Sequence, residues 1–65
     1  MLHAKVIKCI GTKRFEVELF QLESGFYCIK HDNKKEGKVA FSETINDFKT
    51  ASFMFDLKVQ ELEGN

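Results

Sequence analysis

The residues best suited to chemistry are a cysteine, a histidine and an aspartate that stand close together in mid-chain: Cys28, His31 and Asp32. A thiol beside an imidazole is the pairing that activates a cysteine nucleophile. These residues belong to an extended stretch, however, in which successive side chains alternate between two faces. Positions 28 and 31 therefore point to opposite faces unless the chain bends between them. The spacing favours a buried thiol and a solvated histidine over a catalytic pair.

Other side chains that bind metals or transfer protons are scattered. His3 has no partner at the spacing of metal ligands, and Cys9 and Cys28 form no CxxC motif. We expect both cysteines to be small buried side chains. The four glycines stand singly in turns, so no phosphate-binding loop is indicated. We therefore expect no catalytic residues, no metal, no cofactor and no small-molecule substrate, and we interpret the protein as non-enzymatic.

Size and composition indicate one small globular domain over residues 1–65. With 43% hydrophobic residues and seven phenylalanines the chain is too apolar to be disordered. A domain of this length buries only about 60% of its unfolded surface, so its stability is marginal. The sequence shows no signal-peptide pattern and no apolar run near the roughly 20 residues that span a bilayer. We expect a soluble, cytoplasmic protein without a membrane partner.

The C-terminal stretch, residues 47–62, is the run long and periodic enough to form a helix. At helical rotation, five apolar residues fall on one narrow arc and predict a core-facing stripe, with Met54 at its edge: Phe48, Ala51, Phe55, Val59 and Leu62. Phe53 and Leu57, four residues apart, lie on nearly the opposite side. The N-cap is Asn46, Asp47 or Thr50, and Gly64 suits the end of the helix. A helix with two apolar stripes has two surfaces to cover.

The rest of the chain reads as four strands separated by short polar turns. They are residues 2–10, 14–22, 26–31 and 38–43. Gly25 is expected to supply a positive φ in the second turn. Short loops between consecutive strands imply antiparallel neighbours. The predicted fold is therefore α+β: a four-stranded antiparallel meander with one C-terminal helix packed on one face, in the order ββββα.

The second strand shows the clearest alternation, with Phe15, Val17 and Leu19 between Glu16 and Glu18. The C-terminal end of this strand departs from the alternation, because Phe20 and Leu22 lie on the same side of the strand as Glu16 and Glu18. Either a bulge resets the register there or the outer face is not fully polar.

The other strands are less clear about which residues face the core. In the third, Phe26 and Cys28 share one face and Tyr27 and Ile29 the other, as expected of a strand covered on both sides. In the fourth we expect Val39 and Phe41 inward. The register of the first strand stays open, with two sets of residues competing for the core side: Ala4, Val6 and Ile10 against Ile7 and Cys9.

Several short motifs resemble those of YegP-like small domains of unknown function. They are Ser24-Gly25-Phe26-Tyr27, Gly37-Lys38-Val39, Ser42-Glu43, and Phe48 followed by Lys49-Thr50-Ala51. The resemblance covers roughly residues 15–62 and implies a strand-strand-strand-helix module, here in a single copy with an extra N-terminal strand. It brings no catalytic residues with it.

The chain has more apolar residues than one helix and one sheet face can bury. This surplus is the main functional clue. The predicted interface residues are Phe53, Leu57, Phe20, Leu22 and Tyr27. Burying a Phe or Leu side chain stabilises by roughly 1.5–3 kcal/mol, so leaving several exposed on a marginal domain is costly. We expect a protein-interaction module that forms a homodimer or docks on a partner protein.

The alternative is a nucleic-acid-binding module that uses the third hairpin. Its basic residues are Lys30, His31, Lys34, Lys35 and Lys38. Tyr27 or Phe26 lies near enough to stack on a base. Asp32 and Glu36 dilute this cluster, and the whole chain balances ten basic against ten acidic residues. Because phosphate contacts supply most of the affinity for nucleic acids, this balance makes the alternative the less favoured one.

Overall fold

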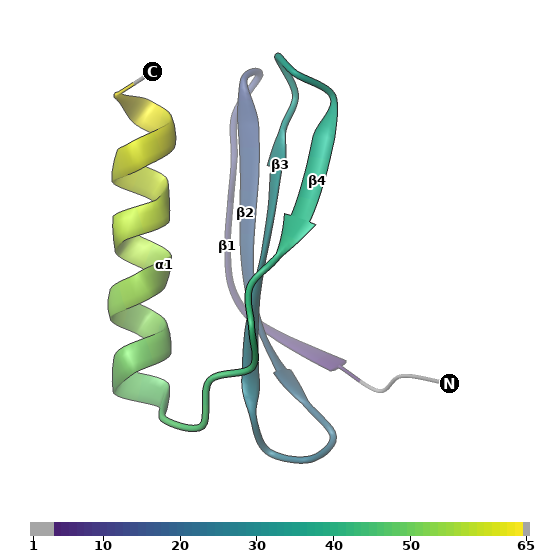
Figure 1. Ribbon diagram of the computed structural model, residues 1–65, viewed down its shortest axis with the longest axis vertical. Helices are drawn as coiled ribbons and strands as arrows, with labels where there is room; N and C mark the ends of the chain where they lie inside the picture. The colour runs from purple at the N-terminus through teal and green to yellow at the C-terminus, as the bar shows by residue number, and fades with distance from the viewer. Residues whose placement is uncertain (1–3, 65) are drawn as a thin grey trace.

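The computed structural model describes residues 4–64 as one antiparallel sheet covered on one face by a helix (Figure 1). The elements are β1 (Ala4–Gly11), β2 (Phe15–Leu22), β3 (Tyr27–Asn33), β4 (Lys38–Phe41) and α1 (Phe48–Glu63). The strands follow chain order across the sheet, β1-β2-β3-β4. The predicted ββββα fold is confirmed. His3 lies outside the described residues, and no helix within 4–64 is long and apolar enough to cross a membrane.

The core lies between α1 and the two central strands, β2 and β3. Alternation in β2 creates it, because every second residue from Phe15 to Leu19 is buried. The buried members are Phe15, Val17, Leu19, Ile29, Ala51, Phe55 and Leu62, and the partly buried ones packed on them are Ile7, Ile10, Tyr27, Ile45 and Val59. The helix stripe is thus confirmed, except that Phe48, on the first turn, stays partly exposed.

A bulge in β1 decides how the first strand faces the core. Val6 pairs with Phe20 and Lys8 with Leu19, so Ile7 is an extra residue between them. A bulge resets side-chain alternation and bends the strand. Ile7 and Ile10 therefore both pack on the core, and Figure 1 shows the start of β1 turning away from α1. Because β2 itself keeps its parity, Phe20 and Leu22 lie on the face away from the helix, called here the outer face.

The connection from β4 to α1 continues along the edge of β3 and fixes where the helix begins (Figure 1). Ile45 exchanges two backbone hydrogen bonds with Tyr27, with N···O distances of 2.7 and 2.8 Å. Asp47 is the N-cap, and its carboxylate accepts hydrogen bonds from the backbone N–H of Thr50 at 2.8 Å and the Thr50 hydroxyl at 2.9 Å. At the other end Gly64 donates its N–H to Gln60 O. The helix is held at both ends by local bonds.

Two predictions about the sheet are wrong. Val39 and Phe41 do not face inward: they pair with Asp32 and Lys30, which places them on the outer face, where both are exposed. The large apolar residues of the fourth strand lie on one side of it. This alternation predicts that one side of the strand is buried, but it does not show which face of the sheet that side belongs to. Because α1 packs on β2 and β3, no described helix lies over β4 to cover an inward face. Cys9 is also exposed rather than buried.

Candidate functional site

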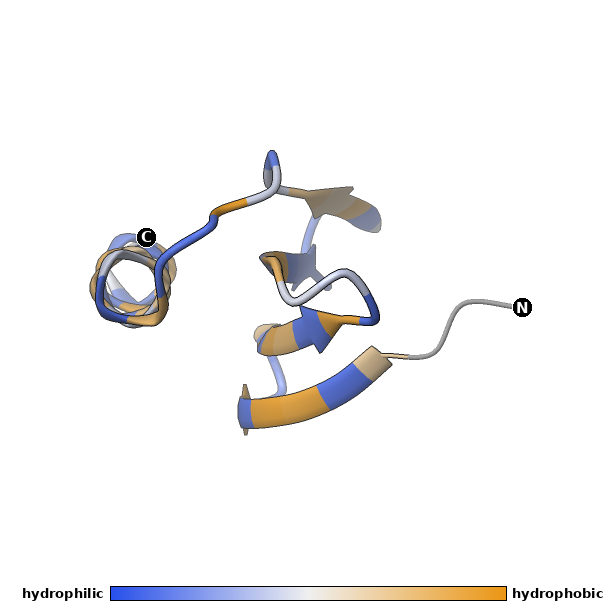
Figure 2. Ribbon diagram, turned by 90° about the horizontal axis from the view of Figure 1, so that it is seen from below, coloured by the Kyte–Doolittle hydropathy of each residue, from blue (hydrophilic) through white to orange (hydrophobic). Residues whose placement is uncertain are grey.

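Apolar side chains from all four strands lie on the outer face of the sheet. Pairing across the strands places Val6, Phe20 and Cys28 in one row. We call the whole set the outer patch: Val6, Phe20, Leu22, Cys28, Val39 and Phe41. Val6 is 53% and Phe41 61% exposed. Viewed along the strands, α1 lies on one side of the sheet and no described element covers the other (Figure 2).

The outer patch is held in place by contacts within the sheet. The rings of Phe20 and Phe41 meet edge to face with centroids 6.4 Å apart. Cys28 is 7% exposed, and its thiol donates to Ser42 O at 3.4 Å. Ser42 Oγ in turn accepts the backbone N–H of Ile29 at 2.9 Å. The patch is therefore a preformed surface with a fixed centre, a condition that lowers the entropic cost of binding.

Charged residues occupy the other end of the outer face. Lys30 Nζ lies 3.8 Å from a Glu18 carboxylate oxygen, and both side chains keep partial access to solvent. Two residues further along each central strand, Glu16 pairs with Asp32, and Val39 of the outer patch is the partner of Asp32 on β4. Two like charges placed directly opposite each other are unfavourable in a sheet. On the two central strands the outer face thus runs from an apolar pair through a mixed pair to an acidic pair, while on β4 Phe41 lies level with the mixed pair and Val39 with the acidic pair.

The helix carries a second exposed apolar surface. Phe53 and Leu57 are 63% and 47% exposed, as their spacing predicted. They are remote from the outer patch, because the sheet lies between α1 and that face (Figures 1 and 2). Tyr27 belongs to neither surface. Its ring lies 5.6 Å from that of Phe48 and it packs on the core, so it is not part of the interface proposed below.

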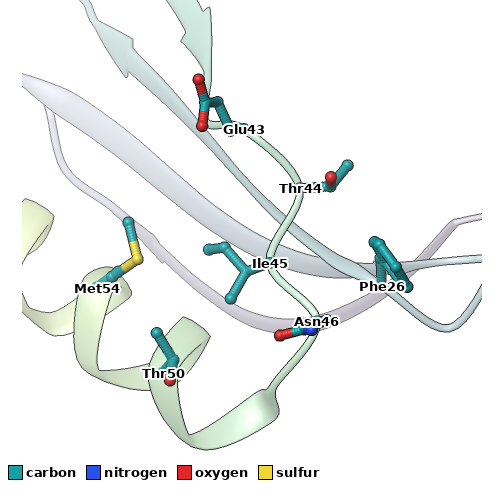
Figure 3. A pocket seen from close by; sticks show the side chains of 7 residues that line it. All are labelled: Phe26, Glu43, Thr44, Ile45, Asn46, Thr50 and Met54. Atoms are coloured by element: carbon teal, nitrogen blue, oxygen red, sulfur yellow. The ribbon is translucent and has the colours of Figure 1, made fainter.

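An open pocket of about 620 Å³ lies between the β4–α1 connection and the first turns of the helix (Figure 3). Its lining residues are Phe26, Glu43, Thr44, Ile45, Asn46, Thr50 and Met54. Phe26, Ile45 and Met54 give the pocket an apolar part, and the other four lining residues are polar. No sequence pattern indicates it, since it depends on the path of the connection.

The candidate catalytic pair is separated by the sheet. Cys28 lies on the outer face, whereas His31 faces the helix side and lines a 290 Å³ polar cleft with Lys38, Lys58 and Glu61. Burial lowers the pKa of His31, and the nearby Lys58 ammonium lowers it further, against an opposing effect of Glu61. Within residues 4–64, no three His, Cys, Asp or Glu side chains gather at metal-binding distances.

The basic residues of the third hairpin point in several directions. Lys30 lies on the outer face beside Glu18, while His31 and Lys38 line the cleft on the helix side. Lys34 Nζ donates to Thr12 O at 3.1 Å, which ties it to the neighbouring β1–β2 turn. These positive charges are divided between the two faces of the sheet, and they do not form one continuous basic surface.

Comparison of the chain with family models, with curated proteins and with solved structures finds no match. The relationship to YegP-like domains stays a prediction.

Proposed function

We propose that this protein is a non-enzymatic interaction module whose outer sheet face binds another protein surface. The observation that carries the proposal is the outer patch: six apolar side chains from all four strands, on a face that no described element covers. Exposed single hydrophobic residues are ordinary, but a continuous apolar patch on a small domain marks an interaction site.

The energetics favour burial of this face in a complex. Removing apolar surface from water stabilises by about 25 cal/mol per Å². A domain of 65 residues retains little stability to spare. The edge-to-face contact of Phe20 with Phe41 presents two aromatic rings side by side, and aromatic residues are enriched among those that dominate binding energy. The outer patch has the composition of an interface centre.

The outer patch is a better candidate than the exposed helix pair. Phe53 and Leu57 come from one helix, and their neighbours Asp56 and Gln60 are exposed. The outer patch draws its apolar members from all four strands, and its Phe20 and Phe41 rings are held by their contact with each other. The helix pair therefore serves as a control surface of similar chemistry at a different site.

Site-specific photo-crosslinking tests this proposal in a way that does not require the partner to be identified beforehand. A photoreactive phenylalanine analogue replaces Phe41 in one variant and Phe53 in the other, in cells that produce the protein. We expect a discrete protein crosslink from position 41 and none from position 53. Absence of a crosslink from position 41 would contradict the proposal, and a crosslink from position 53 alone would move the interface to the helix.

A further inference from the structure

We infer that the surface bound by the outer face is a second copy of this chain, packed face to face about a twofold axis that runs parallel to the strands. The inference rests on the proposed function and adds the identity and geometry of the partner. It is carried by the order in which apolar and charged residues follow one another on the outer face.

Three successive rows cross the two central strands. Phe20 pairs with Cys28, Glu18 with Lys30, and Glu16 with Asp32. The apolar row lies at the end of the sheet next to the β2–β3 turn, and the acidic row lies at the opposite end. Because the face is asymmetric along the strands, the direction of a twofold axis decides which rows meet.

A twofold axis parallel to the strands, between β2 and β3, exchanges these two strands and keeps each row at its own level. Phe20 then lies opposite Cys28 of the second copy, and Glu18 opposite the second copy's Lys30. An axis across the strands at the level of the Glu18–Lys30 row would instead set Phe20 against the acidic row and bury charges beside apolar groups, which is costly. Self-complementary contact of this kind is what an isologous dimer requires.

The Glu18–Lys30 pair is suited to a role between two copies. Its 3.8 Å separation is longer than the 2.7–2.9 Å or so of a charge-assisted hydrogen bond, so the intrachain contact is a loose one. At the proposed interface, two glutamates and two lysines would alternate around the axis. Each carboxylate would then lie near two ammonium groups, which is electrostatic complementarity of the kind that selects a partner.

A dimer of standard size requires a sizeable share of this chain's surface. A standard interface takes about 800 Å² from each partner, close to a sixth of the 4724 Å² accessible surface of this chain. Two stacked sheets lie about 10 Å apart, with strand directions within about 30° of each other. Large side chains such as Phe20 and Phe41 fill that spacing.

The same geometry contains an unfavourable contact that the twofold axis repeats. At the acidic end, Glu16 of each copy comes to lie near Asp32 of the other, and like charges repel. Replacing Glu16 with Gln in both copies removes both Glu16–Asp32 contacts. The arrangement therefore predicts that E16Q dimerises more tightly than the wild type, by about twofold to thirtyfold, which is the range of two solvent-exposed charge pairs.

Complementary charge reversal gives the decisive test, with sedimentation velocity as the readout. The variants are E18K and K30E, alone and mixed, with K49E on the helix as a control for altered net charge. Each reversal sets like charges against each other and should weaken self-association at least about tenfold, as coupling across charged interfaces indicates. An equimolar mixture should restore the dimer, because position 18 of one chain then opposes position 30 of the other with opposite sign.

A double variant, E18K/K30E, keeps the test valid if a single reversal harms folding. It retains an opposite-charge pair within each chain and between like chains. It should therefore dimerise with itself but not exchange with the wild type. Failure of the mixture to restore the dimer, or free exchange of the double variant with the wild type, would overturn the geometry.

Failure of the partner assignment can be told apart from failure of the proposed function. A monomeric wild type whose position 41 crosslinks to a different protein overturns the second copy as partner and leaves the interaction function standing. A monomeric wild type with no crosslink from position 41 overturns both.

Discussion

The rings of Phe20 on β2 and Phe41 on β4 meet edge to face, with centroids 6.4 Å apart and planes at 84°. Their strands are separated by β3, so this contact spans the outer face next to Cys28. Aromatic pairs of this geometry contribute about 0.5–1.5 kcal/mol beyond their buried area. The contact ties the edge strand β4, which the helix does not cover, to the centre of the sheet. It also holds Phe41 in a fixed and exposed position.

Replacing Phe41 with Ala should separate its role in the fold from its role in binding. We expect the free energy of unfolding of the monomer to fall by about 1 kcal/mol, since the aromatic contact is lost but the ring is 61% exposed. Urea denaturation at low protein concentration measures this. Val39→Ala, on the same strand and face, is the control and should cost less. A loss above about 3 kcal/mol, the scale of core truncations, would show that Phe41 is a core residue in solution.

Replacing Leu19 with Ala should unfold much of the population. Leu19 is fully buried at the centre of the core, and such truncations cost about 2–5 kcal/mol through lost burial and an unfilled cavity. Leu57→Ala removes the same atoms from an exposed helix position and should change stability by no more than about 0.5 kcal/mol. Near-equal losses in thermal unfolding experiments would contradict the assignment of the core to this face of the sheet.

The N-cap should make stability depend on pH in the acid range. The hydrogen bond from the Thr50 backbone N–H, with that from its hydroxyl, lowers the pKa of Asp47 below its ordinary value of 3.8. A carboxyl whose pKa is lower in the folded state than in the unfolded state stabilises the fold at pH values above its unfolded-state pKa. This stabilisation is lost as pH falls through the folded-state pKa. Wild type should therefore lose thermal stability below about pH 4 more steeply than Asp47→Asn, whose amide oxygen still caps the helix. Parallel pH profiles of the melting temperature would contradict this role.

His31 should add a second pH dependence at higher pH. Its pKa is lowered from 6.5 by burial and by Lys58, while Glu61 opposes the shift; Lys38 and Glu36 also line this cleft. The folded state thus disfavours the protonated ring. The free energy of unfolding is therefore highest above pH 6.5 and declines as pH falls toward the folded-state pKa of His31. His31→Gln should flatten the unfolding profile in this range, and Lys58→Ala should reduce its slope. An NMR titration in which His31 protonates above 6.5 would contradict this sign.

The order of elements follows from local patterns in the sequence. Alternation around Phe15, Val17 and Leu19 identifies a strand with one buried face, and the period of Ala51, Phe55 and Leu62 identifies the helix. These signals are strong because each buried side needs several residues at regular spacing. Local patterns leave three candidates for the N-cap. The structure identifies Asp47, because its carboxylate accepts the backbone N–H of Thr50.

Local sequence patterns do not predict which side chains of the edge strands β1 and β4 face the core. The bulge at Ile7 changes which side chains of β1 face the core. A bulge in a short apolar strand cannot be recognised reliably from the sequence. An apolar residue such as Phe41 is expected to face inward, yet its orientation is set by the register with β3. Phe20 and Leu22 do lie on the outer face, since β2 keeps its parity. Sequence reasoning misses Phe41 and Val6 as patch members because strand pairing brings them there.

The most direct test of the central claim is a sedimentation velocity series of the wild type from micromolar to about 1 mM, the range over which weak and strong dimers are resolved. Phe41→Asp and Phe53→Asp are measured alongside it, with far-UV circular dichroism to show that all three are folded. We expect a dimer for the wild type and Phe53→Asp, and a monomer for Phe41→Asp. A wild type that stays monomeric throughout, or a dimer that Phe53→Asp abolishes and Phe41→Asp leaves intact, would contradict it.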